Sequence, residues 1–206
     1  MNYARRKARG GKGLLPPNRD QWNPEHHALD LREDLGSPLS EPLDPLAAFS
    51  ILQSATVHPH GAIPAALCHL DHFRKDGSGN WSGMALRLPD GHELVFYNDR
   101  HPETRIRATL MEEFFHLWLG HPRSAVRLIG EGVDEGRTYD SSVEYEAYSS
   151  GAAALVPYTS LNAAVDRGDS MTAIARHFGV SPKLVGFRRK VTKKWRKYHA
   201  RRRPRR

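Results

Sequence analysis

One apolar stretch, expected to be helical, constrains this chain more than any other feature. It spans residues 109–121, TLMEEFFHLWLGH, and is apolar apart from a threonine at its start, two adjacent glutamates and two histidines. Residues four apart in a helix project side by side, so Glu112 and His116 share one face and Glu113 lies one position round. A helix of this composition should be largely buried, and a buried carboxylate is costly unless it is paired or binds a cation.

The pattern E-E-x-x-H differs by one residue from the zinc-binding pattern H-E-x-x-H. In the latter, the two histidines hold a metal and the glutamate after the first acts on the attacking water. Alone, the variant pattern is a weak signal, because any exposed helix can carry it. Arg105 and Arg107, just upstream, offer ordinary ion-pair partners for one carboxylate, but two glutamates and a histidine require more than one such partner.

Length and composition favour one soluble domain with appendages. The chain has 206 residues and a single cysteine, Cys68, which excludes an internal disulfide and a cysteine-based zinc ribbon and suits a reducing cytosol. No segment approaches the roughly 20 apolar residues of a membrane span, and the basic N-terminus lacks the apolar core of a signal peptide. We therefore expect a cytoplasmic protein that does not contact membranes.

The net charge of +8 is concentrated at the two ends of the chain. Basic tails of this kind either bind nucleic acid through its phosphates, without reading sequence, or are solvated and disordered. Both interpretations stay open. The candidate phosphate contacts are Arg188, Arg189, Lys190, Lys193 and Lys194.

Turn and capping residues divide the chain into a series of short elements. The expected elements are helices over residues 28–35, 44–52 and 64–73, strands over 81–88 and 93–98, and helices over 102–120 and 141–157. Asp44 and Pro45 are a typical helix start, and Asp90-Gly91 between two apolar-rich runs indicates a β-hairpin. The hairpin therefore precedes the motif helix directly.

The helix expected over residues 141–157 carries the next acidic group. Ser141 and Ser142 can cap it, and a face of small residues suits close packing against another helix. Glu146 adjoins that face and is the candidate third metal ligand, whereas Glu144 is expected in solvent. The small residues are Ala147, Gly151 and Ala154.

Several segments together resemble the ImmA/IrrE family of metallo-endopeptidases. The segment around Glu146 is similar to the family pattern E-x-E-A-N-x-F-A-x-x-L-L-x-P, with Tyr148 replacing Asn and Ser150-Gly151 replacing Phe-Ala. The resemblance covers about residues 31–191. The matching segments, in order, are Trp81-Ser82-Gly83, Asn98, Arg107-Ala108-Thr109-Leu110, Glu113, His116, Leu119-Gly120-His121, Glu144-Tyr145-Glu146-Ala147, Ala153-Ala154-Leu155-Val156-Pro157 and residues 174–181.

The resemblance implies an α+β, zincin-like metallopeptidase domain over residues 25–160, with a small sheet packed on the motif helix. A disordered basic arm over residues 1–24 would precede it. A helical hairpin of helix-turn-helix type over residues 161–192 and a basic tail over 193–206 would follow it. The hairpin, with Ser181 and Pro182 starting its second helix, would either read DNA or dock on the core, and its apolar face favours docking.

By position, the resemblance makes His116 and Glu146 metal ligands and Glu113 the general base, with Glu112 in place of the family's first histidine. A divalent metal is expected, zinc first. Manganese or iron is the alternative, because Glu112 enriches the site in oxygen and two carboxylates weaken the activation of water. His121 is a further candidate ligand if Gly120 ends the helix in a left-handed turn, and otherwise a histidine at the helix dipole.

The implied function is that of a metal-dependent endopeptidase acting on a protein, namely a helix-turn-helix repressor of a mobile element or stress operon. The substitution at Glu112 motivates an alternative, in which a catalytically reduced regulator binds a protein partner or DNA through the same scaffold. His101 and Tyr148 lie near the motifs in the sequence and are candidates for stabilising the oxyanion.

Overall fold

The structure is a computed structural model that describes residues 13–64, 81–122 and 140–193. In this part the chain forms one three-stranded sheet and seven α-helices, so the expected α+β class is confirmed. No helix in the described ranges has the length and apolarity to cross a membrane. The helix expected over residues 64–73 lies outside these ranges except for its first residue, and so does the basic tail beyond Lys193.

The sheet consists of β1 (Ala55–Pro59), β2 (Gly83–Arg87) and β3 (Glu93–Tyr97) in the order β1-β3-β2. β2 and β3 form the expected antiparallel hairpin, whose turn contains Gly91 at φ +88°. β1 was not predicted, and it pairs in parallel with β3, with Val57 opposite Val95. A short 3-10 helix, η2 (His60–Ala62), follows β1.

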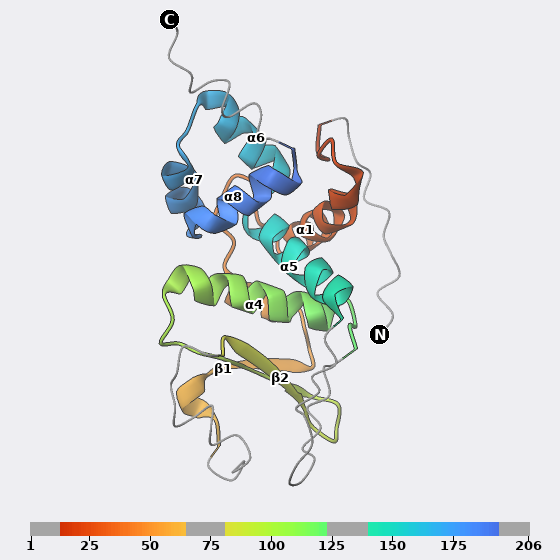
Figure 1. Cartoon of the computed structure of the whole chain (residues 1–206). Coiled ribbons are helices and arrows are strands. Elements are labelled where there is room, and N and C mark those ends of the chain that lie inside the picture. Colours follow the sequence, from red (N-terminus) through yellow and green to blue (C-terminus); the bar gives the residue numbers. More distant parts are fainter. Residues whose placement is uncertain (1–12, 65–80, 123–139, 194–206) are drawn as a thin grey trace, which may run out of the picture.

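The motif helix is α4 (Glu103–Trp118), and its bounds agree with the expected start near Pro102 and end at Gly120. It lies between the sheet on one side and α1, α5 and α8 on the other (Figure 1). α5 (Ser141–Leu155) begins after Asp140, whose side chain accepts hydrogen bonds from the backbone N–H groups of Ser142 and Val143. The N-cap is therefore Asp140 rather than one of the predicted serines.

α4 and α5 pack closely because Gly151 has no side chain. A Cβ atom on Gly151 would lie 3.1 Å from the backbone carbonyl carbon of Met111, closer than most such contacts. The apolar core surrounds this crossing and includes Phe114, Phe115 and Leu155, all fully buried. A smaller cluster of Ile63, Trp81 and Phe96 covers the opposite face of the sheet. The predicted small-residue face therefore performs the expected packing role.

Helices from the two ends of the chain complete the fold. α1 (Trp22–Asp34) follows a 3-10 turn, η1 (Arg19–Gln21), and starts inside the segment that was expected to be a disordered arm. α2 (Pro45–Phe49) has the predicted cap, since Asp44 accepts from the N–H of Leu46. The remaining helices are α6 (Tyr158–Arg167), α7 (Met171–Phe178) and α8 (Pro182–Val191).

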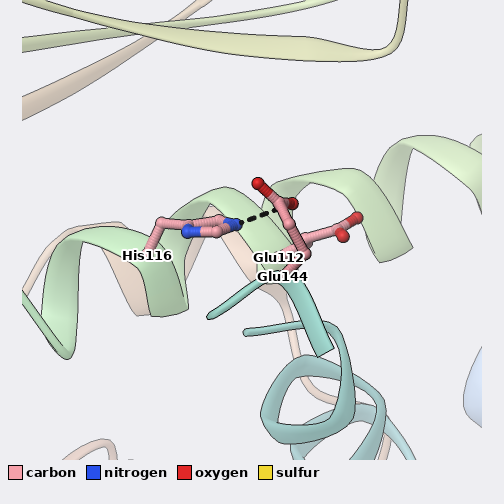
Figure 2. A group of neighbouring side chains, drawn as sticks. All are labelled: Glu112, His116 and Glu144. Carbon is pink, nitrogen blue, oxygen red and sulfur yellow. Dashed lines mark ion pairs between the residues drawn. The ribbon is translucent and has the colours of Figure 1, made fainter. Parts of the chain in front are cut away.

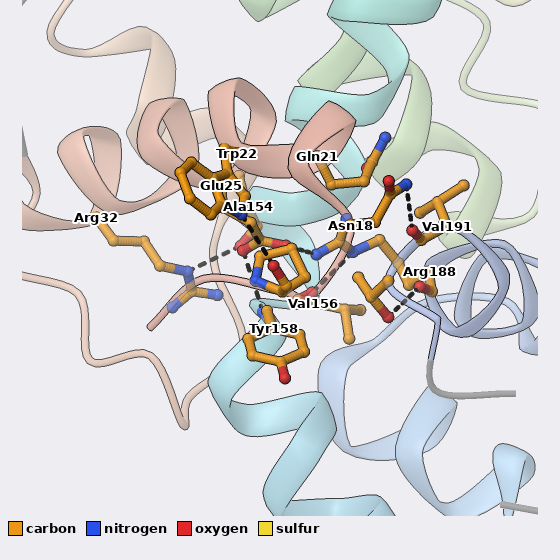
Figure 3. Close-up of polar contacts among 12 residues, drawn as sticks. Asn18, Gln21, Trp22, Glu25, Arg32, Ala154, Val156, Tyr158, Arg188 and Val191 are labelled. Carbon is orange, nitrogen blue, oxygen red and sulfur yellow. Dashed lines mark hydrogen bonds and ion pairs between the residues drawn. The ribbon is translucent and has the colours of Figure 1, made fainter. Parts of the chain in front are cut away.

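A buried ion pair fastens α8 to α1. The guanidinium of Arg188 contacts the carboxylate of Glu25, and both side chains are almost completely buried (Figure 3). Arg188 also donates to the carbonyl of Val156, and Glu25 accepts from the N–H of Tyr158 at the start of α6. The helical hairpin is therefore attached to the core, as its apolar face suggested.

Candidate metal centre

Three side chains from α4 and α5 converge beside α4 (Figure 2). Glu112, His116 and Glu144 each offer a ligand atom, and these atoms all lie within 4.8 Å of one another. The His116 Nε2 atom is 3.4 Å from Glu144 Oε2. One imidazole and two carboxylates at this spacing fit a divalent cation.

Helix periodicity explains why Glu144 belongs to this group. Gly151 faces Met111 of α4, and Glu144 precedes Gly151 by seven residues, which is nearly two full turns. Glu144 therefore lies on the α5 face that packs against α4. The cap at Asp140 lets α5 begin early enough to include it.

Glu146, the predicted third ligand, occupies a different place. It lies about 200° round the helix from Glu144, so the two side chains cannot both point at the cluster. Its Oε2 atom is 3.3 Å from Nε2 of His121, and its side chain is 42% exposed. In the structure the third group beside Glu112 and His116 is therefore Glu144, and Glu146 contacts His121. The seven-residue spacing between Glu144 and Gly151 was the sequence signal that could have identified Glu144.

Crowding of carboxylates perturbs the protonation of the cluster. Burial, together with the nearby charges of Glu113 and Glu144, raises the pKa of Glu112 from 4.5 to about 7. Burial and the charge of Glu112 in turn raise the pKa of the Tyr148 hydroxyl. A bound cation would relieve the repulsion among these carboxylates, so the electrostatics agree with the donor set.

The raised pKa of Glu112 predicts that the metal-free protein loses stability as the pH rises. Between pH 4.5 and 7, the unfolded chain releases this proton and the folded chain keeps it, so the free energy of unfolding falls with increasing pH. Between pH 5 and pH 8 this loss should amount to about 2–3 kcal/mol. Urea unfolding at pH 5 and pH 8 measures it. Since glutamine does not titrate, a Glu112→Gln variant with the same pH dependence as the native protein would contradict the assignment.

The cluster opens on a groove of about 550 Å³ between α4 and β2. Glu113, His116 and Glu144 line one part of it, and Arg87 and Glu93 line another. Glu113 approaches β2 closely, because a Cβ atom on Gly83 would lie only 2.9 Å from Glu113 Oε1. The predicted general base and two of the candidate ligands therefore share one solvent-accessible groove.

Comparison with known families agrees with this geometry. A family model described as Peptidase_M78, IrrE N-terminal-like domain, matches residues 67–190, which is more than half of the chain. The chain belongs to this family. Membership confirms the ImmA/IrrE resemblance, suggests a metal-dependent protease activity and implies a divalent metal. No curated protein and no solved structure matches the chain.

The Peptidase_M78 match includes both helices of the cluster. Contacts in the structure distinguish the two residues that were predicted to stabilise the oxyanion. His101 uses Nε2 to contact the carbonyl oxygen of Trp81 at 2.9 Å, so it supports the chain before β2. Tyr148 lies close enough to Glu112 for that charge to raise the pKa of its hydroxyl, and its ring is 4.9 Å from that of Phe187 on α8. Of the two oxyanion candidates, Tyr148 is therefore the one that lies near a residue of the cluster.

Two of the five predicted phosphate contacts of this Peptidase_M78 chain are buried in the structure. Arg188 is 0% exposed and pairs with Glu25, and Arg189 is 4% exposed. Neither guanidinium is available to a phosphate in this conformation. Lys190 and Lys193 stay exposed, and Lys194 lies outside the described residues.

Proposed function

We propose that this Peptidase_M78 protein is a metal-dependent endopeptidase. The observation that carries the proposal is the convergence of Glu112, His116 and Glu144 beside a groove that also contains Glu113. A metal-binding cluster alone is compatible with a structural role. A carboxylate next to the ligands, in an accessible groove, is what hydrolysis requires in addition.

In the proposed hydrolysis, a bound cation and the protein side chains would have separate roles. A bound divalent cation acts as a Lewis acid on a carbonyl and lowers the pKa of water. Glu112, His116 and Glu144 would hold it, and Glu113 would accept a proton from the attacking water and return it to the leaving amine. Tyr148 stays protonated at neutral pH and is the candidate donor to the developing oxyanion.

The groove favours an extended peptide segment as substrate. Among the described residues, β2 pairs with β3 alone, so its other edge can accept a peptide strand. A segment held along this edge would lie next to the groove that runs from Glu113 to Arg87. Family resemblance supports a narrower proposal, that the physiological substrate is a helix-turn-helix repressor of a mobile element or stress operon.

A library of random twelve-residue peptides with both ends blocked tests the activity. The protein is stripped with a chelator and reloaded separately with Zn²⁺, Mn²⁺ or Fe²⁺, and the products are identified by mass spectrometry. We expect cuts at internal bonds that need a metal and disappear on chelation. Intact peptides after incubation with stoichiometrically loaded protein would contradict the endopeptidase.

Glu112 favours the second candidate function, a catalytically reduced regulator. Two carboxylates and one imidazole neutralise a divalent cation more completely than two imidazoles and one carboxylate, so bound water is acidified less. Oxygen-rich sites also suit Mn²⁺ better than nitrogen-rich sites do. A protein that binds metal in equimolar amounts, cuts no peptide in the library and retains a protein partner or DNA would support the regulator.

A further inference from the structure

The end of α4 brings a second histidine back to the candidate ligand. Gly120 adopts φ +67°, its N–H donates to the carbonyl of Leu117, and the N–H of His121 donates to the carbonyl of His116 at 2.9 Å. These are the two hydrogen bonds of a Schellman motif. The backbone therefore reverses at Gly120, and His121 lies beside His116 instead of facing away.

The two imidazoles and Glu146 form a continuous chain of contacts. Nδ1 of His121 is 3.2 Å from Nδ1 of His116, and Nε2 of His121 is 3.3 Å from Oε2 of Glu146. The ring planes are inclined at 75°, and the His121 side chain is only 8% exposed. His116 thus contacts Glu144 through one ring nitrogen and His121 through the other.

Hydrogen-bond chemistry determines which ring nitrogen carries the proton at each step of this series of contacts. A contact between two imidazole nitrogens needs one N–H and one lone pair. If His116 uses the lone pair of Nε2 to bind a cation, its proton is on Nδ1 and is donated to His121. His121 then carries its own proton on Nε2 and donates it to the carboxylate of Glu146. One set of tautomers satisfies all three groups.

We propose that His121 and Glu146 are positioning residues that hold His116 in the tautomer and orientation needed for metal binding. This inference rests on the proposed metal-dependent function. In this proposal Glu146 accepts a hydrogen bond from His121, whereas the sequence analysis predicted it to be a metal ligand. It also gives Gly120 a function, because a residue with a side chain would adopt its left-handed conformation only under strain.

Metal affinity in purified variants tests the proposal without measuring catalysis. Zn²⁺ binding is measured by competition with a chromophoric chelator, and Co²⁺ spectra report the coordination. His121→Ala should weaken Zn²⁺ binding by about 10–100-fold, and Glu146→Gln should weaken it less. His121→Gln should restore most of the affinity, because an amide can accept from His116 through its oxygen and donate to Glu146 through its nitrogen.

Two controls separate positioning from general damage. His177→Ala removes an imidazole on α7 that contacts the carbonyl of Ser40, and it should leave Zn²⁺ affinity unchanged. Thermal unfolding of the metal-free variants should show that His121→Ala and His121→Gln are equally folded.

The outcomes distinguish the inference from the function on which it rests. An affinity of His121→Ala within twofold of native would overturn the positioning role alone. So would a Co²⁺ spectrum of His121→Ala that shows a changed coordination number, since His121 would then be a ligand. A native protein that binds neither Zn²⁺ nor Co²⁺ would overturn the metal centre and the positioning role together.

Discussion

Replacing Glu113 with glutamine is expected to slow peptide hydrolysis by about 10²–10⁴-fold while the bound metal is retained. Glutamine has nearly the same shape, so the packing beside Gly83 is preserved. It cannot accept the proton of the attacking water at neutral pH. The rate of cleavage of one peptide from the library, with metal content measured on the same sample, provides both quantities.

Two other substitutions on α4 make this experiment specific. Glu103→Gln changes an exposed glutamate at the start of the helix and should leave both rate and metal content unchanged. Glu112→Gln removes a candidate ligand and should reduce metal content together with the rate. If Glu113→Gln were as active as Glu103→Gln, Glu113 would not be the base and the proposed mechanism would be wrong.

Local sequence patterns predicted the elements that are specified by neighbouring residues. The limits of α4 follow from Pro102 and Gly120, and the hairpin follows from a turn at Asp90-Gly91. Ser181 caps α8 as expected, by accepting from the N–H of Leu184. In each case the determining hydrogen bond or backbone conformation lies within a few residues of the element.

β1 was missed because its partner is distant in the sequence. Its five residues, ATVHP, alternate apolar and polar side chains, but the run is short and ends in Pro59, which cannot donate a hydrogen bond to a neighbouring strand. It is held by parallel pairing with β3, from Ala55 opposite Glu93 to Pro59 opposite Tyr97. Such pairing is determined by the tertiary fold, so five alternating residues alone did not identify the strand.

The site was predicted only in part, for a similar reason. The spacing within α4 placed Glu112 and His116 together without any knowledge of the fold. The third carboxylate depends on how α5 is rotated about its axis, and that rotation is fixed by Gly151 against Met111. Arg188 looked like part of a basic run, yet it is buried because Glu25, far away in the sequence, neutralises it.

Removing Arg188 is expected to be the most destabilising change outside the site. Arg188→Met would leave the carboxylate of Glu25 buried with its main counter-charge gone, although the N–H of Tyr158 would still donate to it. Breaking one side of a buried ion pair typically costs about 3–5 kcal/mol. Urea unfolding of the metal-free protein at pH 7 measures this loss, and Lys190→Met, an exposed change on the same helix, should cost little.

The paired substitution separates the cost of an unpaired charge from the value of the contact. Because two apolar side chains of similar size need no counter-charge, Glu25→Leu with Arg188→Met should recover most of the stability lost in Arg188→Met alone. The recovery should be incomplete, since the carbonyl of Val156 and the N–H of Tyr158 both lose a partner at the junction of α5 and α6. A double variant as unstable as the sum of the two single variants would show that Glu25 and Arg188 act independently. The attachment of α8 to α1 would then depend on apolar packing, with the ion pair contributing little.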